Sequence, residues 1–209
     1  MKTIFLFVLI TGLLTFTIVP AQVKAQEREL QLDLNYSINI PGNSFKNDAV
    51  GNTSYRGWTA NLLYNITNHI SVGLGSGYQD FYQKYPRAVY KTSEGADVSA
   101  VLSNSIETIP ILAEVQYRFL PNSIVQPYVG VGVGGNMIVF DQYLGEFDNS
   151  MSNFKFAARP ELGVFVPFRK YGPAGIHLYG VYNYMPYNMN GVTNFNNYGA
   201  GLGIKFPLR

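Results

Sequence analysis

Residues 127–139 read Pro-Tyr-Val-Gly-Val-Gly-Val-Gly-Gly-Asn-Met-Ile-Val, so that valine alternates with glycine from position 129 to position 134. Because successive side chains of a strand point to opposite faces, one face would be apolar and branched and the other would be almost bare. A strand of a soluble sheet usually carries polar residues on one face. The stretch therefore predicts a membrane-spanning barrel strand, with its apolar face in lipid and its bare face making room for other side chains.

Seven further segments alternate with the same period of two. In the first of them, Leu32, Leu34 and Tyr36 share one face, and Asp33 and Asn35 share the other. The sequence therefore predicts an all-β fold, an eight-stranded antiparallel up-and-down transmembrane β-barrel. The expected strands cover residues 30–40, 55–66, 70–81, 106–119, 127–139, 154–166, 175–185 and 195–206.

The connections between these segments alternate between short and long. The long ones cover residues 41–54, 82–105, 141–153 and 186–194. Outer-membrane barrels have short turns on the periplasmic side and longer loops outside, and an even number of strands closes the wall without an open edge. We therefore expect both chain termini on the periplasmic side of the membrane.

The composition is unusual for a soluble domain. Charged residues make up 13% of the chain, about half the usual share, and aromatic residues make up 15%, with 16 Tyr. The chain has no Cys, which excludes disulfides and thiolate metal sites. Low charge and many aromatic residues, without a long apolar run, favour a β-barrel in lipid.

The first 25 residues predict a secretory signal peptide, which leaves a barrel domain over residues 26–209. Lys2 opens a short basic region, an apolar stretch follows over residues 4–19, and Ala25 closes a small-residue cleavage pattern. The alternative is a retained membrane anchor, for which the stretch is short. The segment holds two of the 15 Lys and Arg, so 13 basic residues face 13 acidic ones in the remainder. Without clustered positive charge, we expect no nucleic-acid partner.

The polar faces of the strands predict a charged lumen. An eight-stranded barrel is just wide enough for side chains to fill, and buried charges are tolerated only when they are paired. We expect the first and last strands to join a lysine to an aspartate, and charges on the fourth and sixth strands to meet across the glycines of the fifth. These pairs would form a plug that leaves no wide pore. The predicted lumen charge network is Asp33, Glu114, Arg118, Lys155, Arg159, Glu161, His177 and Lys205.

Aromatic residues lie near the ends of the apolar rows, where their rings would meet the lipid headgroups. The predicted aromatic girdle is Trp58, Tyr64, Tyr78, Tyr117, Phe119, Tyr184, Tyr198 and Phe206. A soluble ligand-binding barrel is the alternative, and it would reverse the two faces, with the charges outside.

Several segments resemble those of small outer-membrane β-barrel proteins of the OmpA-transmembrane-like, OmpW-like and opacity types. Residues 127–134 resemble their Pro-Tyr-x-Gly-x-Gly-x-Gly strand. The row Tyr198, Leu202, Ile204 and Phe206 is similar to their C-terminal signal, although three residues follow Phe206. The resemblance implies a Gram-negative-type outer membrane, contact with its lipid, and insertion by the barrel assembly machinery.

For function, the resemblance implies a structural or interaction role in the envelope, or a small channel for ions or apolar solutes. Loops 82–105 and 141–153 are the expected contacts for an extracellular ligand, since exposed loops on a rigid scaffold commonly bind, although they could equally be a plain solvated surface. We expect no enzyme, no cofactor and no metal. The chain has only His69 and His177, and Tyr179 stands where lipid A deacylases of similar size carry the serine.

Overall fold

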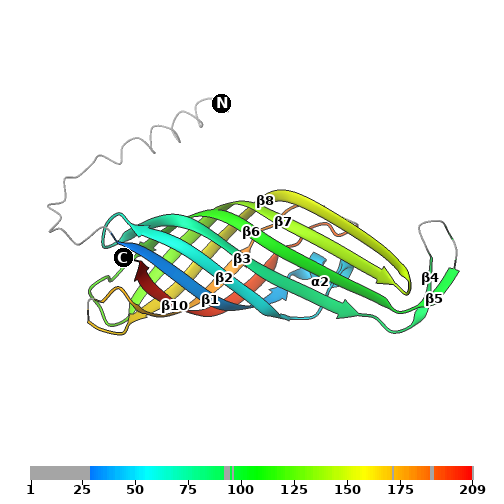
Figure 1. Ribbon diagram of the computed structural model, residues 1–209, viewed down its shortest axis with the longest axis horizontal. Helices are drawn as coiled ribbons and strands as arrows, with labels where there is room; N and C mark the ends of the chain where they lie inside the picture. Colours follow the sequence, from blue (N-terminus) through cyan, green and yellow to red (C-terminus); the bar gives the residue numbers. More distant parts are fainter. Residues whose placement is uncertain (1–28, 92–94, 96, 171, 189–190, 209) are drawn as a thin grey trace, which may run out of the picture.

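The computed structural model describes residues 29–91, 95, 97–170, 172–188 and 191–208, so the predicted signal peptide lies outside the described residues. Eight antiparallel strands form a closed barrel in the order β1-β10-β9-β8-β7-β6-β3-β2, which confirms the predicted fold class (Figure 1). No helix in the described ranges is long and apolar enough to cross a membrane. The wall strands are β1 (Leu30–Pro41), β2 (Ser54–Asn65), β3 (Ile70–Lys84), β6 (Leu102–Arg118), β7 (Gln126–Leu144), β8 (Phe147–Pro167), β9 (Gly175–Asn183) and β10 (Asn197–Leu208).

The apolar rows face outward and the polar rows face inward, as the alternation predicts. Val131 and Leu202 expose 45% and 57% of their surfaces on the outer wall. Arg159 and Lys205, at 5% and 1%, are enclosed by it. The soluble alternative, with charges outside and an apolar interior, is therefore wrong. Lipid is the medium that such an outer surface fits.

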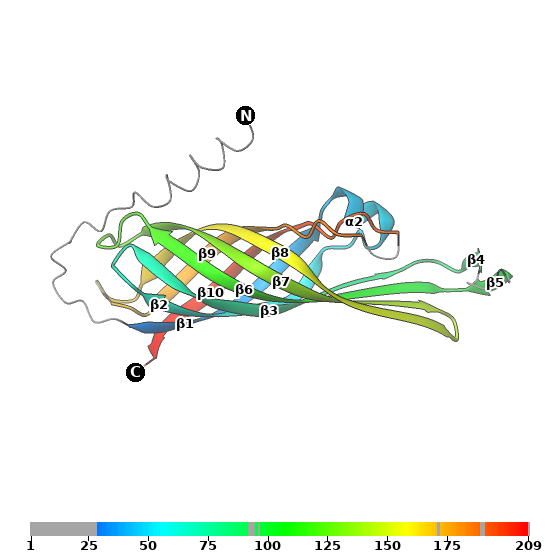
Figure 2. The same cartoon turned by 90° about the horizontal axis from the view of Figure 1, so that it is seen from above.

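The two ends of the barrel differ. Leu30 pairs with Leu208 at the end that carries the short connections, which we call the turn end. At the other end, the hairpin end, β3, β6, β7 and β8 extend past the remaining strands as a curved sheet, which we call the protruding sheet (Figure 2). The hairpin of β4 (Ala88–Lys91) and β5 (Asp97–Ala100) continues from it.

The protruding sheet corrects two predicted loops. Residues 141–153 belong to β7 and β8, which pair without interruption up to Leu144 and Phe147. Gly145, with φ of 64°, supplies the left-handed conformation of the tight turn between them. In segment 82–105, residues 82–84 and 102–105 continue β3 and β6, and residues 88–91 and 97–100 pair as β4 and β5. In the protruding sheet, the outward-facing residues of the strands become more polar, and a polar stretch of sequence resembles a loop. The backbone hydrogen bonds between the strands do not require apolar side chains, so the strand pairing continues.

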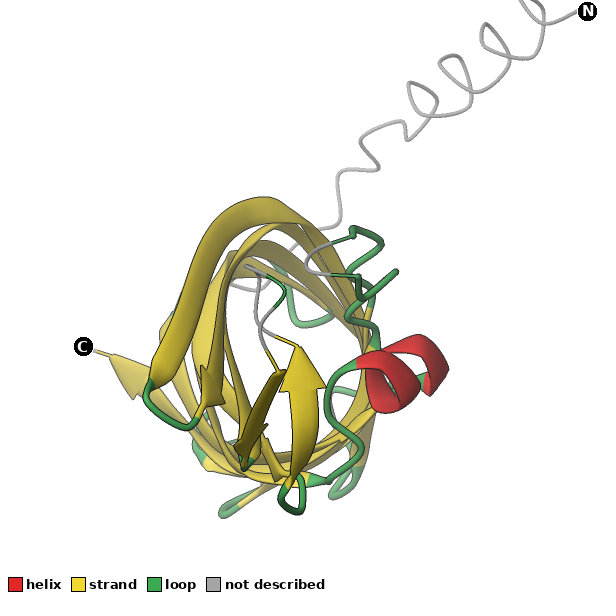
Figure 3. Cartoon of the chain, turned by 90° about the vertical axis from the view of Figure 1, so that its right-hand side faces the viewer, coloured by secondary structure: helices red, strands yellow, loops and turns green. Residues whose placement is uncertain are grey.

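A short helix and a loop segment close the hairpin end of the barrel. The alternating sequence pattern does not predict them. Helix α2 (Asn43–Asp48) lies at this end of the barrel (Figure 3), and its buried side chains and those of residues 185–188 and 191–195 pack against β3, β6, β7 and β8. The Phe45 ring lies 4.8 Å from the ring of Phe81 and 5.2 Å from that of Phe195. We call this cluster the apolar cap; its buried members are Phe45, Ala49, Val50, Phe81, Ile106, Leu112, Ile138, Phe140, Ala157, Met185, Val192 and Phe195.

Hydrogen bonds to backbone carbonyls fix the cap to the barrel. The N–H of Gly42 donates to the carbonyl of Asn196 at 2.8 Å, and Asn104 Nδ2 donates to the carbonyl of Ala49 at 3.0 Å. Phe195 was expected as the first residue of the last strand, but it is completely buried in the cap, and β10 begins at Asn197. A side chain that completes an apolar core gains more from burial than from the outer wall.

The cap should contribute measurably to stability. Replacing Phe45 by Ala removes a fully buried ring and should lower the free energy of unfolding by about 3–5 kcal/mol. Phe147→Ala is the matched control, because that ring is 57% exposed in the protruding sheet and should be nearly neutral. Urea titrations in detergent micelles, read by the gel mobility of the folded form, measure both variants. Equal midpoints for the two would show that the cap is only loosely packed.

Candidate functional site: the closed lumen

Glycines in the wall make room for the polar side chains of the lumen. The carboxylate of Glu114 occupies the space where Gly75 lacks a side chain, Asn35 Oδ1 does so at Gly203, and the Tyr179 hydroxyl does so at Gly201. A Cβ at any of these glycines would overlap with the neighbouring side chain. The bare faces of the glycine-rich strands are therefore complementary to the polar faces of their neighbours.

The central contact of the lumen is an ion pair between Arg159 on β8 and Glu114 on β6. Their side chains are 6% and 4% exposed, and Gly132 of β7 is the cross-strand neighbour of both. Arg159 Nη2 also lies 3.4 Å from Asn61 Oδ1 of β2. The guanidinium thus reaches past the glycine and spans the barrel. Breaking such a pair would leave a buried charge without a partner, which is strongly unfavourable.

A second ion pair lies nearer the turn end. Lys205 of β10 and Asp33 of β1 are direct cross-strand neighbours, with Nζ 3.4 Å from Oδ2. Lys205 Nζ also lies 3.4 Å from Gln116 Oε1 and 5.6 Å from the centre of the Phe165 ring. This ion pair holds the first strand to the last, where the barrel closes.

Aromatic and amide side chains join the remaining lumen charges. The Tyr128 hydroxyl lies 2.8 Å from Glu161 Oε1 and 3.0 Å from His177 Nδ1. His177 Nε2 lies 2.5 Å from Asn35 Oδ1. The alternating pattern places Tyr128 and Asn35 on the inward faces of their strands. It does not predict their hydrogen-bond partners, because uncharged polar residues have no complementary charge to pair with.

Two of the predicted lumen charges differ from the expectation. Arg118 lies in the lumen beside Lys205, with its guanidinium 5.3 Å from the centre of the Phe165 ring, but it does not join Glu114 and Arg159. Lys155 is exposed, which corrects its placement inside the barrel. Lys155 lies on the same face of β8 as Arg159, which points inward. At position 155, however, β8 is already part of the protruding sheet, where no opposite wall encloses the side chain.

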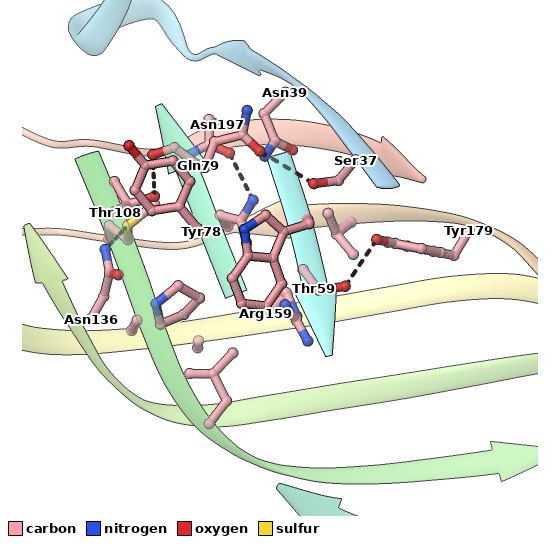
Figure 4. A pocket seen from close by; sticks show the side chains of 18 residues that line it. Ser37, Asn39, Thr59, Tyr78, Gln79, Thr108, Asn136, Arg159, Tyr179 and Asn197 are labelled. Atoms are coloured by element: carbon pink, nitrogen blue, oxygen red, sulfur yellow. Dashed lines mark hydrogen bonds between the residues drawn. The ribbon is translucent and has the colours of Figure 1, made fainter. Parts of the chain in front are cut away.

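A small cavity of about 40 Å³ separates the Arg159 guanidinium from the apolar cap (Figure 4). Amide side chains surround it, among them Asn39, Gln79 and Asn136, and the space suits a few water molecules. Asn136 Nδ2 lies 2.8 Å from Met185 Sδ of the cap and 3.4 Å from the Tyr187 hydroxyl. Burial raises the pKa of that hydroxyl, which therefore remains protonated. The lumen is thus closed by charge in the middle and by apolar packing at the hairpin end.

The predicted girdle residues divide between the two ends of the outer wall. Tyr64, Tyr117, Phe119 and Phe206 lie toward the turn end, and Trp58, Tyr78, Tyr184 and Tyr198 lie toward the hairpin end. Their role at the membrane interfaces stays a prediction. The structure adds Tyr36 beside Trp58, and Tyr182, whose ring centre is 5.0 Å from that of Tyr198.

No group of three or more His, Asp or Glu residues that could hold a metal occurs in the described ranges. His177 is enclosed by Tyr128 and Asn35, and the neighbouring Tyr179 ring stacks on it with centres 5.5 Å apart. These contacts supply a structural reason for the burial of the His177 imidazole.

Comparison with solved structures identifies similar barrels. The chain resembles Neisserial surface protein A at 16% identity and a TM-score of 0.56, over 86% of this chain and 96% of that one. The N-terminal β-barrel domain of OprF from Pseudomonas aeruginosa shares 11% identity at a TM-score of 0.46, over 87% and 100% of the two chains. The attachment invasion locus protein Ail of Yersinia pestis, solved with a heparin analogue, shares 14% at 0.47, over 86% and 99%.

No curated protein matches the chain in sequence. The family model of the outer membrane protein beta-barrel domain matches residues 10–206, which include every strand of the barrel wall up to Phe206. That match agrees with the closed ring of eight strands and its outward apolar rows. The chain therefore belongs to the outer membrane protein beta-barrel family.

Proposed function

We propose that this outer-membrane protein is a closed, non-conducting scaffold that presents the protruding sheet outside the cell as an interaction surface. The observation that carries the first part is the double closure of the lumen, by the Glu114–Arg159 pair and by the apolar cap. Long extensions at one end and short turns at the other favour an extracellular hairpin end, with both termini in the periplasm. The signal peptide over residues 1–25 and insertion by the barrel assembly machinery belong to the same proposal.

The outer edge of β8 supports the second part of the proposal. Ala158 and Tyr184 exchange two backbone hydrogen bonds, of 3.1 Å and 2.8 Å, across the β8–β9 seam. Backbone groups of alternate residues in a strand point to opposite sides, so those of Phe156, Phe154 and Ser152 also point away from β7. β9 ends at Asn183, and residues 147–156 of β8 are all exposed.

An open strand edge is a template for another strand. Among the described residues, no strand pairs with the outward backbone groups of Ser152, Phe154 and Phe156, which match the backbone of an extended polypeptide. Phe154 and Phe156 add exposed apolar surface beside them. Glu146 and Asp148 make the tip of this hairpin acidic, whereas the exposed Lys155 lies further along β8. We therefore propose that the surface receives an extended peptide segment, with a basic residue at the end that lies near the hairpin tip.

A small channel for ions or apolar solutes is the second candidate, because a charged pair in a lumen can act as a gate. Planar-bilayer recordings distinguish the two. The wild-type protein should show no porin-like conductance, and Arg159→Ala should remain closed because the apolar cap is intact. It should also lose about 3–5 kcal/mol of stability, because Glu114 is left buried and unpaired. Steady wild-type conductance, or opening of the Arg159→Ala variant with Phe45 still buried, would favour the channel.

The open edge of β8 can be blocked without breaking the barrel. The N–H of Ser152 points away from β7, so Ser152→Pro removes no bond of the β7–β8 ladder but obstructs an incoming strand. The probe is a synthetic peptide of alternating valine and threonine with a lysine at each end. We expect Ser152→Pro to weaken its binding about tenfold or more, as the loss of one or two hydrogen bonds predicts.

Ser152→Ala is the matched control, and it should bind the peptide as the wild type does. Both variants must keep the heat-modifiable gel mobility of a folded barrel. The edge proposal is wrong if the wild type does not bind the peptide at millimolar concentration, or if the proline and alanine variants bind it equally well.

A further inference from the structure

The contacts of His177 determine where its hydrogen atoms lie. Asn35 Nδ2 donates to Thr59 Oγ1 at 3.0 Å, which turns Asn35 Oδ1, an acceptor, toward the imidazole. Oδ1 lies 2.5 Å from His177 Nε2, so Nε2 carries a hydrogen and donates it. On the other side of the ring, Nδ1 lies 3.0 Å from the hydroxyl of Tyr128.

Tyr128 connects the imidazole to a carboxylate. Its hydroxyl lies 2.8 Å from Glu161 Oε1, so the three groups form one chain of hydrogen bonds from β9 through β7 to β8. A hydroxyl has a single hydrogen to donate. If it donates to an ionised Glu161, then Nδ1 must donate to the hydroxyl oxygen, and His177 is an imidazolium. If it donates to Nδ1, then Glu161 must be protonated and donate in turn.

The two arrangements hold the same number of protons. In passing from one to the other, the proton of the Glu161 carboxyl moves to the Tyr128 oxygen while the proton of Tyr128 moves to Nδ1, so atoms and charge balance. With one proton more, both Glu161 and Nδ1 would be donors, and the Tyr128 hydrogen would have no acceptor in the chain. With one fewer, two acceptors would compete for a single hydrogen. Only the one-proton state satisfies every buried group.

We propose that Glu161 and His177 form a single-proton site in the lumen, in which Tyr128 relays one shared proton between them. This site is independent of whether the barrel conducts or binds a peptide. Since these side chains come from β7, β8 and β9, and Asn35 comes from β1, the chain of hydrogen bonds joins four strands of the wall. Uptake of a second proton would leave the Tyr128 hydrogen without an acceptor in the chain.

The surroundings fix the members of the chain in place. Asn35 Oδ1 occupies the space at Gly203, and the end of the Tyr128 ring occupies the space at Gly163. The side chains are buried, with His177 1% and Tyr128 3% exposed. The other ionisable groups around the site are Tyr179 on β9, Lys205 on β10, Arg159 on β8, Asp33 on β1, and Glu114 and Arg118 on β6.

The test is the protonation of His177 in the full-length protein in detergent micelles, followed by nitrogen-15 NMR of labelled histidine across pH. A shared proton makes the titration belong to the pair. Glu161→Gln keeps the shape and the hydrogen bond to Tyr128 but cannot carry the proton or the charge. The midpoint of His177 should therefore fall by about one pH unit or more, since the ionised carboxylate favours the imidazolium. Tyr128→Phe, which interrupts the relay, should also shift it.

His69 is the internal control, because it lies exposed in a turn with Nδ1 2.8 Å from the carbonyl of Arg118. Its midpoint should be the same in all three proteins, and its signals are assigned with His69→Gln. Gel mobility confirms that each variant is folded. A His177 midpoint that is unchanged in both Glu161→Gln and Tyr128→Phe would overturn the proposal, because the imidazole would then hold its proton independently of Glu161.

Discussion

The structure depends on fitting charged side chains into a barrel that is barely wide enough to contain them. Eight strands leave an interior that side chains fill, and a charge inside it needs both a partner and space. Glycines supply the space: Gly132 lies between Glu114 and Arg159, and Gly75 and Gly203 receive polar side chains from neighbouring strands. In β7 the valines therefore face the lipid, and the glycines leave space for the side chains of the lumen.

The same constraint explains why the hairpin end needs a different solution. Toward the hairpin end, β3, β6, β7 and β8 extend past the other strands, so their inner faces there have no opposite strand (Figure 2). Apolar residues such as Phe81 and Phe140 occupy those faces, and α2 with residues 185–188 and 191–195 packs against them. Charge pairing closes the part of the lumen that lies within the wall, and hydrophobic burial closes the part that opens to water.

This arrangement combines a rigid base with an open edge. The apolar cap packs against the base of the protruding sheet, and in the part of the chain that the structure describes no strand pairs with the outer edge of residues 147–156 of β8. Sheets with unpaired edges tend to acquire strands, and most proteins protect such edges. An exposed edge on a firmly anchored sheet is consistent with a surface that acts by contact, and a closed lumen is consistent with a barrel that does not transport.

The sequence by itself determined the fold, the strand count and the orientation of the faces. Alternating apolar and polar residues in a chain with few charges are typical of a membrane barrel, whose apolar rows face lipid and whose polar rows face the lumen. The sequence also identified most of the charged residues of the lumen, because the face on which a residue lies depends only on its position along its own strand. Tertiary structure alone decided that Lys155 lies outside, that Arg118 stacks on Phe165, and that Phe45 and Phe195 meet in a cap. These outcomes depend on how far each strand extends past its neighbours, which is set by pairing between distant segments and leaves no periodic signal in the chain.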